Sequence, residues 1–238
     1  MNIVYWAVFD KGLSIVNNKD PVNVFNKTKN IYPKILSKEA NFIACPAYYQ
    51  EASKIFNLLA PFRYSLEFKE GHVITKNYDQ NTFDKYVTAS NADIKFIQLK
   101  YDYVFFTEKP CLMTASAPYF SSSELSIRAN YIPGSFDISK WFRNLNIPII
   151  LKPAFDSLSI EEGDEILSVK FDFQNNQKII LKKFYISPTL EHVYETNMKS
   201  RMFFNKNLDS YLSNIYEKFT MSKTRNLVLK EIKSNLLE

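Results

Sequence analysis

Trp141 and Arg143 are the two side chains whose types and spacing best suit the binding of a small molecule. They flank Phe142, so in an extended segment they would lie on the same face of the chain. An indole stacks on planar groups and a guanidinium pairs with anions. We therefore take Lys140, Trp141 and Arg143 as candidate ligand-binding residues, with Asp137 close by in the sequence. The alternative is that Trp141 caps the core and Arg143 pairs with an acidic side chain.

Two pairs of neighbouring aromatic residues are candidates for contact with another protein. Tyr48 and Tyr49 form one pair, and Tyr119 and Phe120 follow Pro118 as the other. Aromatic side chains in loops often mark protein interfaces. Because aromatic residues make up 16% of the chain, the alternative is that these four belong to the core.

Several catalytic motifs are absent from the sequence. The four glycines lie far apart, whereas a Rossmann fingerprint or a P-loop needs clustered glycines that bring backbone amides close to phosphate. His72 and His192 form no HExxH motif, which argues against zinc proteases and most Ser/His hydrolases. Cys45 and Cys111 form no CxxC pair and are expected to be buried, reduced thiols. We expect no metal site and no resident cofactor.

The composition is biased towards residues that A/T-rich codons encode. The 238 residues include 22 Asn, 22 Ile and 25 Lys, but only 4 Gly and 5 Arg. A genome of low GC content, which is common among bacteriophages, explains this bias without reference to function. The net charge of +5 comes from scattered lysines, so single-stranded nucleic acid is an alternative partner rather than the expected one.

Neither a membrane anchor nor an export signal is expected. No run of residues reaches the 18 or more apolar positions that span a bilayer. The N-terminal segment lacks the basic region and the cleavage site of a signal peptide. We expect a soluble protein of the host cytoplasm or the virion that is neither secreted nor transmembrane.

Residues 1–188 are expected to form a mainly β domain, either a sandwich or a barrel. Short runs of β-branched and aromatic residues recur at spacings near ten residues. Residues 62–69 alternate apolar and polar side chains, and a turn at 70–71 predicts a hairpin with residues 72–75. Apolar spacing predicts a helix within residues 48–59. The other predicted strands are residues 3–9, 22–25, 32–37, 41–45, 94–99, 103–106, 111–116, 124–131, 147–151, 166–173 and 178–184, with a hairpin tip at 174–177 between the last two.

Residues 189–238 are expected to form a C-terminal helical segment. They contain no Pro and no Gly, and apolar residues recur at helical intervals. The pattern predicts two amphipathic helices, residues 189–204 and 208–237, with a break at 205–207. We expect this segment to pack on the β domain or to serve in assembly.

The stretch from Tyr131 to Phe171 carries three motifs at characteristic spacing. They are PGSFD at residues 133–137, NIPIIL at 146–151 and LSIEEGDEILSVKF at 158–171. Together they resemble the β-barrel family of dUTPases and dCTP deaminases, which has a PG turn ending in Asp and an I-x-x-G-D hairpin. The resemblance implies a dUTPase-like barrel in part, a hairpin at Gly163 and an oligomer of identical chains.

The same resemblance implies a catalytic role for Asp137. In the family the Asp of the PG turn is the general base for the hydrolytic water, and Mg²⁺ assists. This sequence departs from the pattern elsewhere: Lys140 stands where an aromatic residue stacks on uracil, and Glu165 and Ser168 replace a basic residue and a glutamine. The family's AGxDL motif and its glycine-rich phosphate loop are absent, so the amides that would hold phosphate are missing.

A second set of motifs extends over more of the chain. It consists of CPA at residues 45–47, PFRY at 61–64, TEKPC at 107–111, FDISKWFRNLN at 136–146 and EGDE at 162–165. These motifs look like a family of uncharacterised proteins from tailed bacteriophages, especially marine ones. The resemblance agrees with the low-GC composition and implies no activity.

The sequence therefore supports one main hypothesis and two alternatives. The main hypothesis is a non-catalytic, phage-encoded β protein that acts through protein–protein contacts, as a minor virion component or a host-acting factor. The first alternative is a divergent dUTPase-like nucleotide hydrolase or deaminase that uses Asp137. The second is a single-stranded nucleic-acid-binding protein, which would need lysine and aromatic side chains on one surface.

Overall fold

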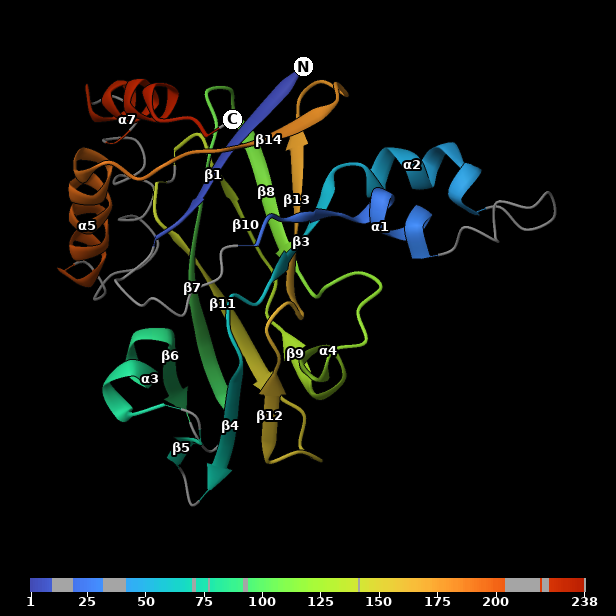
Figure 1. Ribbon diagram of the computed structural model, residues 1–238, viewed down its shortest axis with the longest axis vertical. Coiled ribbons are helices and arrows are strands. Elements are labelled where there is room, and N and C mark those ends of the chain that lie inside the picture. Colours follow the sequence, from blue (N-terminus) through green and yellow to red (C-terminus); the bar gives the residue numbers. More distant parts are fainter. Residues whose placement is uncertain are drawn as a thin grey trace.

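The computed structural model describes residues 1–9, 19–31, 42–69, 72–76, 78–91, 94–140, 142–203, 219 and 223–237. Strand residues outnumber helical residues, and helices follow near the C-terminus, which confirms the predicted mainly β class with a C-terminal helical extension (Figure 1). Within these residues the sheets do not close into a barrel. Trp141, the predicted strand 32–37, the turn at 70–71 and the break at 205–207 lie outside the described residues.

Six strands form the largest sheet, called sheet A. The order is β14-β1-β7-β11-β9, and β6 also pairs with β7. The β1–β14 pair is parallel and the other pairs are antiparallel. β7 joins the two predicted strands 94–99 and 103–106 into one, with Asp102 at a φ of +50° inside it. The strands are β1 (Asn2–Val8), β6 (Val87–Asn91), β7 (Phe96–Phe106), β9 (Ala129–Tyr131), β11 (Asn144–Leu151) and β14 (Ile179–Lys183).

Two smaller sheets complete the β structure. Sheet B has the order β10-β8-β13-β3-β2, and sheet C has the order β12-β4-β5. The β4–β5 pair is antiparallel, so the predicted hairpin of residues 62–75 is confirmed. The strands are β2 (Val22–Asn23), β3 (Ile55–Leu59), β4 (Tyr64–Lys69), β5 (His72–Thr75), β8 (Cys111–Ser116), β10 (Gly134–Asp137), β12 (Ser157–Ile160) and β13 (Glu165–Phe173).

Two predicted strands and one predicted helix need correction. Residues 22–25 give only two strand residues before a helix begins at Val24, and residues 48–59 divide into a short helix and strand β3, whose first four residues are all buried. The predicted strand 124–131 begins as a helix because the Ser123 side chain accepts a hydrogen bond from the Ser126 amide at its N-terminus. The helices are α1 (Val24–Ile31), the 3-10 turn η2 (Phe42–Ala44), α2 (Pro46–Ala52), α3 (Gln80–Tyr86), α4 (Glu124–Arg128), α5 (Pro188–Phe203) and α7 (Lys223–Ser234).

Two predicted hairpins are also wrong. β13 pairs with β3 and β8, whereas β14 pairs with β1, so the chain crosses from sheet B to sheet A at residues 174–177. β12 pairs with β4, so the turn at Gly163, where φ is +88°, joins two different sheets. Cys111 is buried as expected, but Cys45 is exposed because it precedes α2 at the surface.

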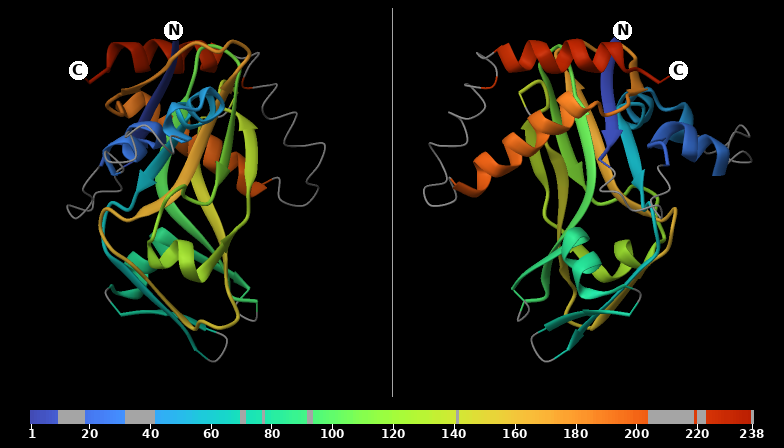
Figure 2. Two further views of the ribbon diagram at one scale, coloured as in Figure 1. Left: turned by 90° about the vertical axis from the view of Figure 1, so that its right-hand side faces the viewer. Right: turned by 60° about the vertical axis from the view of Figure 1, so that its left-hand side comes forward.

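Two hydrophobic cores lie on opposite faces of sheet A. Alternate residues of β1 point to opposite faces, so Val4 and Trp6 join the core between the sheets while Tyr5 and Ala7 join a second core. The second core contains buried side chains of α5 and α7, which lie over sheet A (Figure 2). The division of the chain into two units at residue 188 stays a prediction. In the described part, no helix is long and apolar enough to cross a membrane.

Candidate functional site

Four aromatic side chains from three separate segments gather beside α1. The ring centroid of Phe120 lies 6.4 Å from that of Tyr48 and 6.5 Å from that of Phe42, and Phe42 and Tyr48 are 5.2 Å apart. Phe25 of α1 lies 4.9 Å from Tyr49 and 6.3 Å from Tyr48. We call Phe42, Tyr48, Tyr49 and Phe120 the aromatic face. The structure thus brings together residues of both aromatic pairs that the sequence singled out, although those pairs lie far apart along the chain.

Most of the aromatic face is open to solvent. Phe42 is 40% exposed, Phe120 is 45% exposed and Tyr49 is 52% exposed. Full burial of such a side chain is worth about 1.5–3 kcal/mol, and each of these half-exposed rings obtains only part of it. Tyr119 is also 46% exposed, but its ring makes no aromatic contact with any residue in the described part of the chain. A contiguous exposed apolar surface of this kind is typical of an interaction site.

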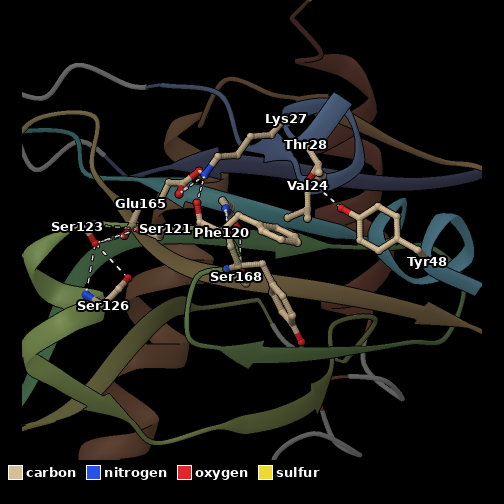
Figure 3. Close-up of polar contacts among 12 residues, drawn as sticks. Val24, Lys27, Thr28, Tyr48, Phe120, Ser121, Ser123, Ser126, Glu165 and Ser168 are labelled. Carbon is tan, nitrogen blue, oxygen red and sulfur yellow. Dashed lines mark hydrogen bonds and ion pairs between the residues drawn. The ribbon is translucent and has the colours of Figure 1, made fainter. Parts of the chain in front are cut away.

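Tyr48 is the half-buried member of the aromatic face and anchors α2 to α1. Its hydroxyl donates to Thr28 Oγ1 at 2.7 Å, and Thr28 Oγ1 donates to the Val24 carbonyl at 2.8 Å (Figure 3). Thr28 and Val24 are both buried. The hydroxyl of Tyr48 is therefore held by the buried Thr28, while its ring contacts Phe42 and Phe120.

Phe120 has a backbone conformation that is unfavourable for its residue type. Its φ is +55°, in the left-handed region that costs a residue with a side chain roughly 1–2 kcal/mol. The carbonyl of Phe120 accepts a hydrogen bond from Lys27 Nζ at 2.8 Å, and the preceding carbonyl of Tyr119 accepts one from Asn57 Nδ2 at 2.9 Å. The Tyr119 amide donates to Ser168 Oγ at 3.0 Å. Strain that the surroundings maintain in this way is common at functional sites.

The groups that hold this loop are themselves buried. Asn57 and Ser168 are fully buried, and the Ser168 hydroxyl donates to Asn57 Oδ1. Lys27 forms an ion pair with Glu165, and their side chains are only 16% and 12% exposed. The network joins α1, β3, β13 and the loop before α4, as Figure 3 shows.

The far end of the loop is fixed by three serines. Ser121 Oγ lies 3.1 Å from Ser123 Oγ, and Ser123 Oγ donates to the Glu165 carbonyl at 3.3 Å. The Ser126 amide donates to Ser123 Oγ at 3.4 Å and so caps α4. Because both ends of the loop are held, a partner would not have to order it on binding, which preserves binding free energy.

Asp137 and Lys140 form a separate, smaller cluster at the end of β10. Asp137 Oδ1 accepts hydrogen bonds from the amides of Ser139 at 2.9 Å and Cys111 at 3.4 Å. Lys140 Nζ lies 4.0 Å from Asp137 Oδ2, and the Asp137 side chain is 30% exposed. One carboxylate oxygen therefore serves to close the turn.

Arg143 lies in the buried layer between sheet A and α5. It is 7% exposed, and Asp102 and Asn144 beside it are also buried. Asp102 Oδ1 accepts hydrogen bonds from Asn144 Nδ2 at 3.0 Å and from the Tyr194 hydroxyl at 3.2 Å. Burial, and then the charge of Asp102, raise the pKa of the Tyr194 hydroxyl, while the charge of Arg143 lowers it. Arg143 therefore belongs to the buried packing layer beneath α5.

The described residues contain no cluster of metal-ligating side chains. Mg²⁺ prefers several oxygen ligands in octahedral geometry. No group of three or more His, Cys, Asp or Glu side chains in the described ranges is arranged to hold a metal ion. The carboxylate that the dUTPase resemblance singles out, Asp137, has a lysine as its neighbour.

Comparison with known proteins gives weak structural similarities only. No protein-family model matches the chain, and no curated protein matches it. Similar solved structures include the dUTPase of Staphylococcus bacteriophage 80alpha, with 11% identity, a TM-score of 0.36 and coverage of 74% of this chain and 95% of that chain. The dUTPase of phage phi11 of S. aureus has 13% identity, a TM-score of 0.30 and coverage of 53% and 82%.

A mutant of the phi11 enzyme is described as coordinating a structural Mg(II) ion. These similar structures are phage dUTPases, the family that residues 131–171 resemble. Identities and TM-scores this low carry no argument about activity.

Proposed function

We propose that this chain is a phage-encoded protein that acts through protein–protein contacts and that the aromatic face meets the partner. The observation that carries the proposal is the contrast between the exposed rings and the buried network that fixes them. Phe120 is 45% exposed at a φ of +55°, yet Lys27 and Asn57 hold its loop from the interior. Rigid exposed aromatic residues are typical of interface hot spots.

The proposal does not include catalysis at Asp137. A general base must accept a proton from water, and Asp137 Oδ1 already accepts two backbone amides while Lys140 lies near Oδ2. We expect the purified protein to release no phosphate or pyrophosphate from dUTP or dCTP with Mg²⁺, and to release no ammonia. Turnover by the wild type that is lost in Asp137→Ala would instead support the nucleotide-hydrolase or deaminase alternative.

The proposal is tested by comparing how well folded variants of the protein capture a partner. Tagged wild type, the double variant Tyr49→Ala/Phe120→Ala and the control Tyr185→Ala are incubated with extract of phage-infected host cells. Tyr185 is 62% exposed and lies after β14, outside the aromatic face. A protein retained by the wild type and by Tyr185→Ala, but lost by the double variant, is then purified and titrated.

Removal of two hot-spot rings is expected to weaken binding by about 2 kcal/mol or more, roughly 30-fold in Kd. Equal affinity of wild type and double variant for every captured protein would refute the proposal. The two roles foreseen from the sequence, minor virion component and host-acting factor, differ in whether the captured protein is phage-encoded or host-encoded.

A further inference from the structure

A hollow of about 350 Å³ lies beside the aromatic face, between α1, α2 and the turn that joins β13 to β14. Its size is within the range of small-molecule sites. Side-chain amides are enriched in its lining: Asn and Gln supply 27 of the 238 residues of the chain but five of the twelve residues that line the hollow. Those five residues are Asn23, Asn26, Gln50, Asn176 and Gln177.

Some of these amides are committed to the fold and others are available. Asn23 Nδ2 donates to the carbonyls of Ser53 and Ile55, and Asn23 Oδ1 accepts from the Asn26 amide. Asn23 therefore fixes the wall of the hollow. The exposed side-chain amides of Asn26 and Gln50 form no hydrogen bond with the described part of the chain, so both can bind a ligand.

Three aromatic residues line the hollow, Phe25, Tyr49 and the buried Phe56, and the rings of Phe25 and Tyr49 meet edge to face. Phe25 and Tyr49 have ring centroids 4.9 Å apart and an interplanar angle of 85°. Two such rings cannot enclose a flat nucleobase between parallel faces. A single ring face beside free amides instead suits a ligand with one apolar face and polar groups around its edge.

The charge of the hollow is positive. Lys54 and Lys178 line it, and no acidic residue does so among the described residues. Lys54 Nζ donates to Asn176 Oδ1 at 3.3 Å, and Lys178 is exposed. The lining carries two ammonium groups and no carboxylate, and the nearby Glu51, whose pKa Lys54 helps to lower, is paired with Lys170, so the lining favours an anionic group on the ligand. Because no arginine lines the hollow, bidentate recognition of phosphate is not available.

We propose that this hollow binds an acidic sugar, a pyranose ring that carries a carboxylate. The C–H face of the ring packs on Tyr49, which is 52% exposed. Each sugar hydroxyl is both donor and acceptor, and the side-chain amides of Asn26 and Gln50 offer both functions. The carboxylate pairs with Lys54 and Lys178. This inference goes beyond the proposed protein contact, since only Tyr49 belongs to both surfaces.

Saturation-transfer NMR on the full chain tests the proposal. The probes are sodium D-glucuronate and N-acetylneuraminate, with D-glucose and thymidine monophosphate for comparison. We expect signal on the ring protons of at least one acidic sugar, a loss of that signal in Tyr49→Ala and in Asn26→Leu, and full signal in Tyr185→Ala. Lys54→Gln is expected to raise the Kd of the acidic sugar about tenfold, which corresponds to about 1.4 kcal/mol.

Phe120→Ala separates this proposal from the protein contact, because Phe120 does not line the hollow. We expect it to bind the acidic sugar like the wild type even if it loses the protein partner. The proposal is overturned if neither acidic sugar gives a signal or if Tyr49→Ala and Asn26→Leu retain it. Glucose binding as tightly as the acidic sugars, or thymidine monophosphate binding more tightly, would also overturn it.

Discussion

Two aromatic layers cover opposite sides of the β structure, and they differ in what lies over them. On the outer face of sheet A, the rings of Phe9 and Tyr194 stack with centroids 3.8 Å apart, and Phe106 contacts Phe142 and Phe219. All five of these side chains are buried beneath or within the C-terminal helical layer. The aromatic face on the other side has no second layer in the described residues, and most of its rings remain 40–52% exposed.

The same contrast extends to two of the three non-glycine residues that have a positive φ among the described residues. Asp102 has a φ of +50° and is 1% exposed, and its carboxylate joins Asn144 and Tyr194 within the packing layer under α5. Phe120 has a φ of +55° and is 45% exposed. The strained residue inside the packed layer contributes to the architecture, whereas the strained residue at Phe120 presents an exposed ring at the surface that we propose as the binding site.

The largest expected effect is the loss of stability when a buried aromatic ring is removed, compared with the removal of an exposed one. Phe106→Ala removes a fully buried side chain and is expected to lower the free energy of unfolding by about 3–5 kcal/mol. Phe42→Ala, at an exposed ring of the aromatic face, should lower it by less than about 1 kcal/mol. Urea denaturation of both variants measures the difference. Similar losses would mean that the aromatic face is part of the core after all.

The second largest effect is expected at Asn57, a buried residue that holds the loop of Phe120 from the interior. Asn57→Ala leaves the Ser168 hydroxyl and the Tyr119 carbonyl without their buried partner, so we expect a loss of about 1–3 kcal/mol. We also expect faster proteolysis of the loop at residues 117–123. Asn130→Ala, at an exposed position of β9, is the matched control and should change neither quantity. Unchanged proteolysis in Asn57→Ala would show that the network does not hold the loop.

Glycine and alanine at position 120 report the backbone strain directly. Both substitutions remove the ring, but glycine adopts a φ of +55° without penalty, so Phe120→Gly should be about 1 kcal/mol more stable than Phe120→Ala. At Tyr119, where φ is not positive, the order should reverse. Thermal unfolding of the four variants checks both orders, and the same order at both positions would argue against strain at Phe120.

The smallest expected effect is a pH dependence at the edge of the aromatic face. Lys170 Nζ lies 2.7 Å from Glu51 Oε2, and this hydrogen bond holds the pKa of Glu51 below its usual value and raises that of Lys170. A lowered carboxyl pKa stabilises the fold above the unfolded pKa near 4.5, and this contribution is lost as pH falls through the folded value. The raised lysine pKa stabilises the fold below about 10.5, and that contribution is lost at higher pH.

Because Glu51 is 56% exposed, Glu51→Gln should lower stability by less than about 1 kcal/mol near pH 7. The difference from wild type should shrink below pH 4. Urea denaturation from pH 3 to 9 measures it, and a difference that grows towards acid pH would contradict the assigned direction. The pair Glu108–Lys233, which joins α7 to the loop before β8, has the same pKa directions and offers a comparison on the covered side.

Local sequence patterns predict correctly those elements that are buried on one face and exposed on the other. β4 alternates buried and half-exposed residues, so its sequence period matches its burial. The helix predicted within residues 48–59 is partly wrong because the same apolar spacing occurs in a helix and in a strand that is buried on both faces. Strand β3 is buried on both faces. No residue type marks the positive φ at Phe120, since phenylalanine is not a residue that favours this conformation.

The candidate site depends on contacts that no local pattern contains. Tyr48 and Phe120 were recognised as aromatic loop residues, but their meeting at 6.4 Å results from the packing of α2 against the loop before α4. Phe42 had no distinguishing signal, and Lys27 and Asn57 were not singled out because their partners lie far away in the chain. The hollow likewise combines residues of α1, α2 and the turn at 174–178.

Photo-crosslinking from the aromatic face shows whether a partner protein lies on that surface. Benzoylphenylalanine is incorporated at position 120, at position 49 and, as the control, at position 185, and each protein is irradiated in extract of phage-infected host cells. We expect one shared partner polypeptide to be cross-linked from positions 120 and 49, and none from position 185. No product from positions 120 and 49, or the same products from position 185, would contradict the claim that the exposed aromatic layer is a binding surface.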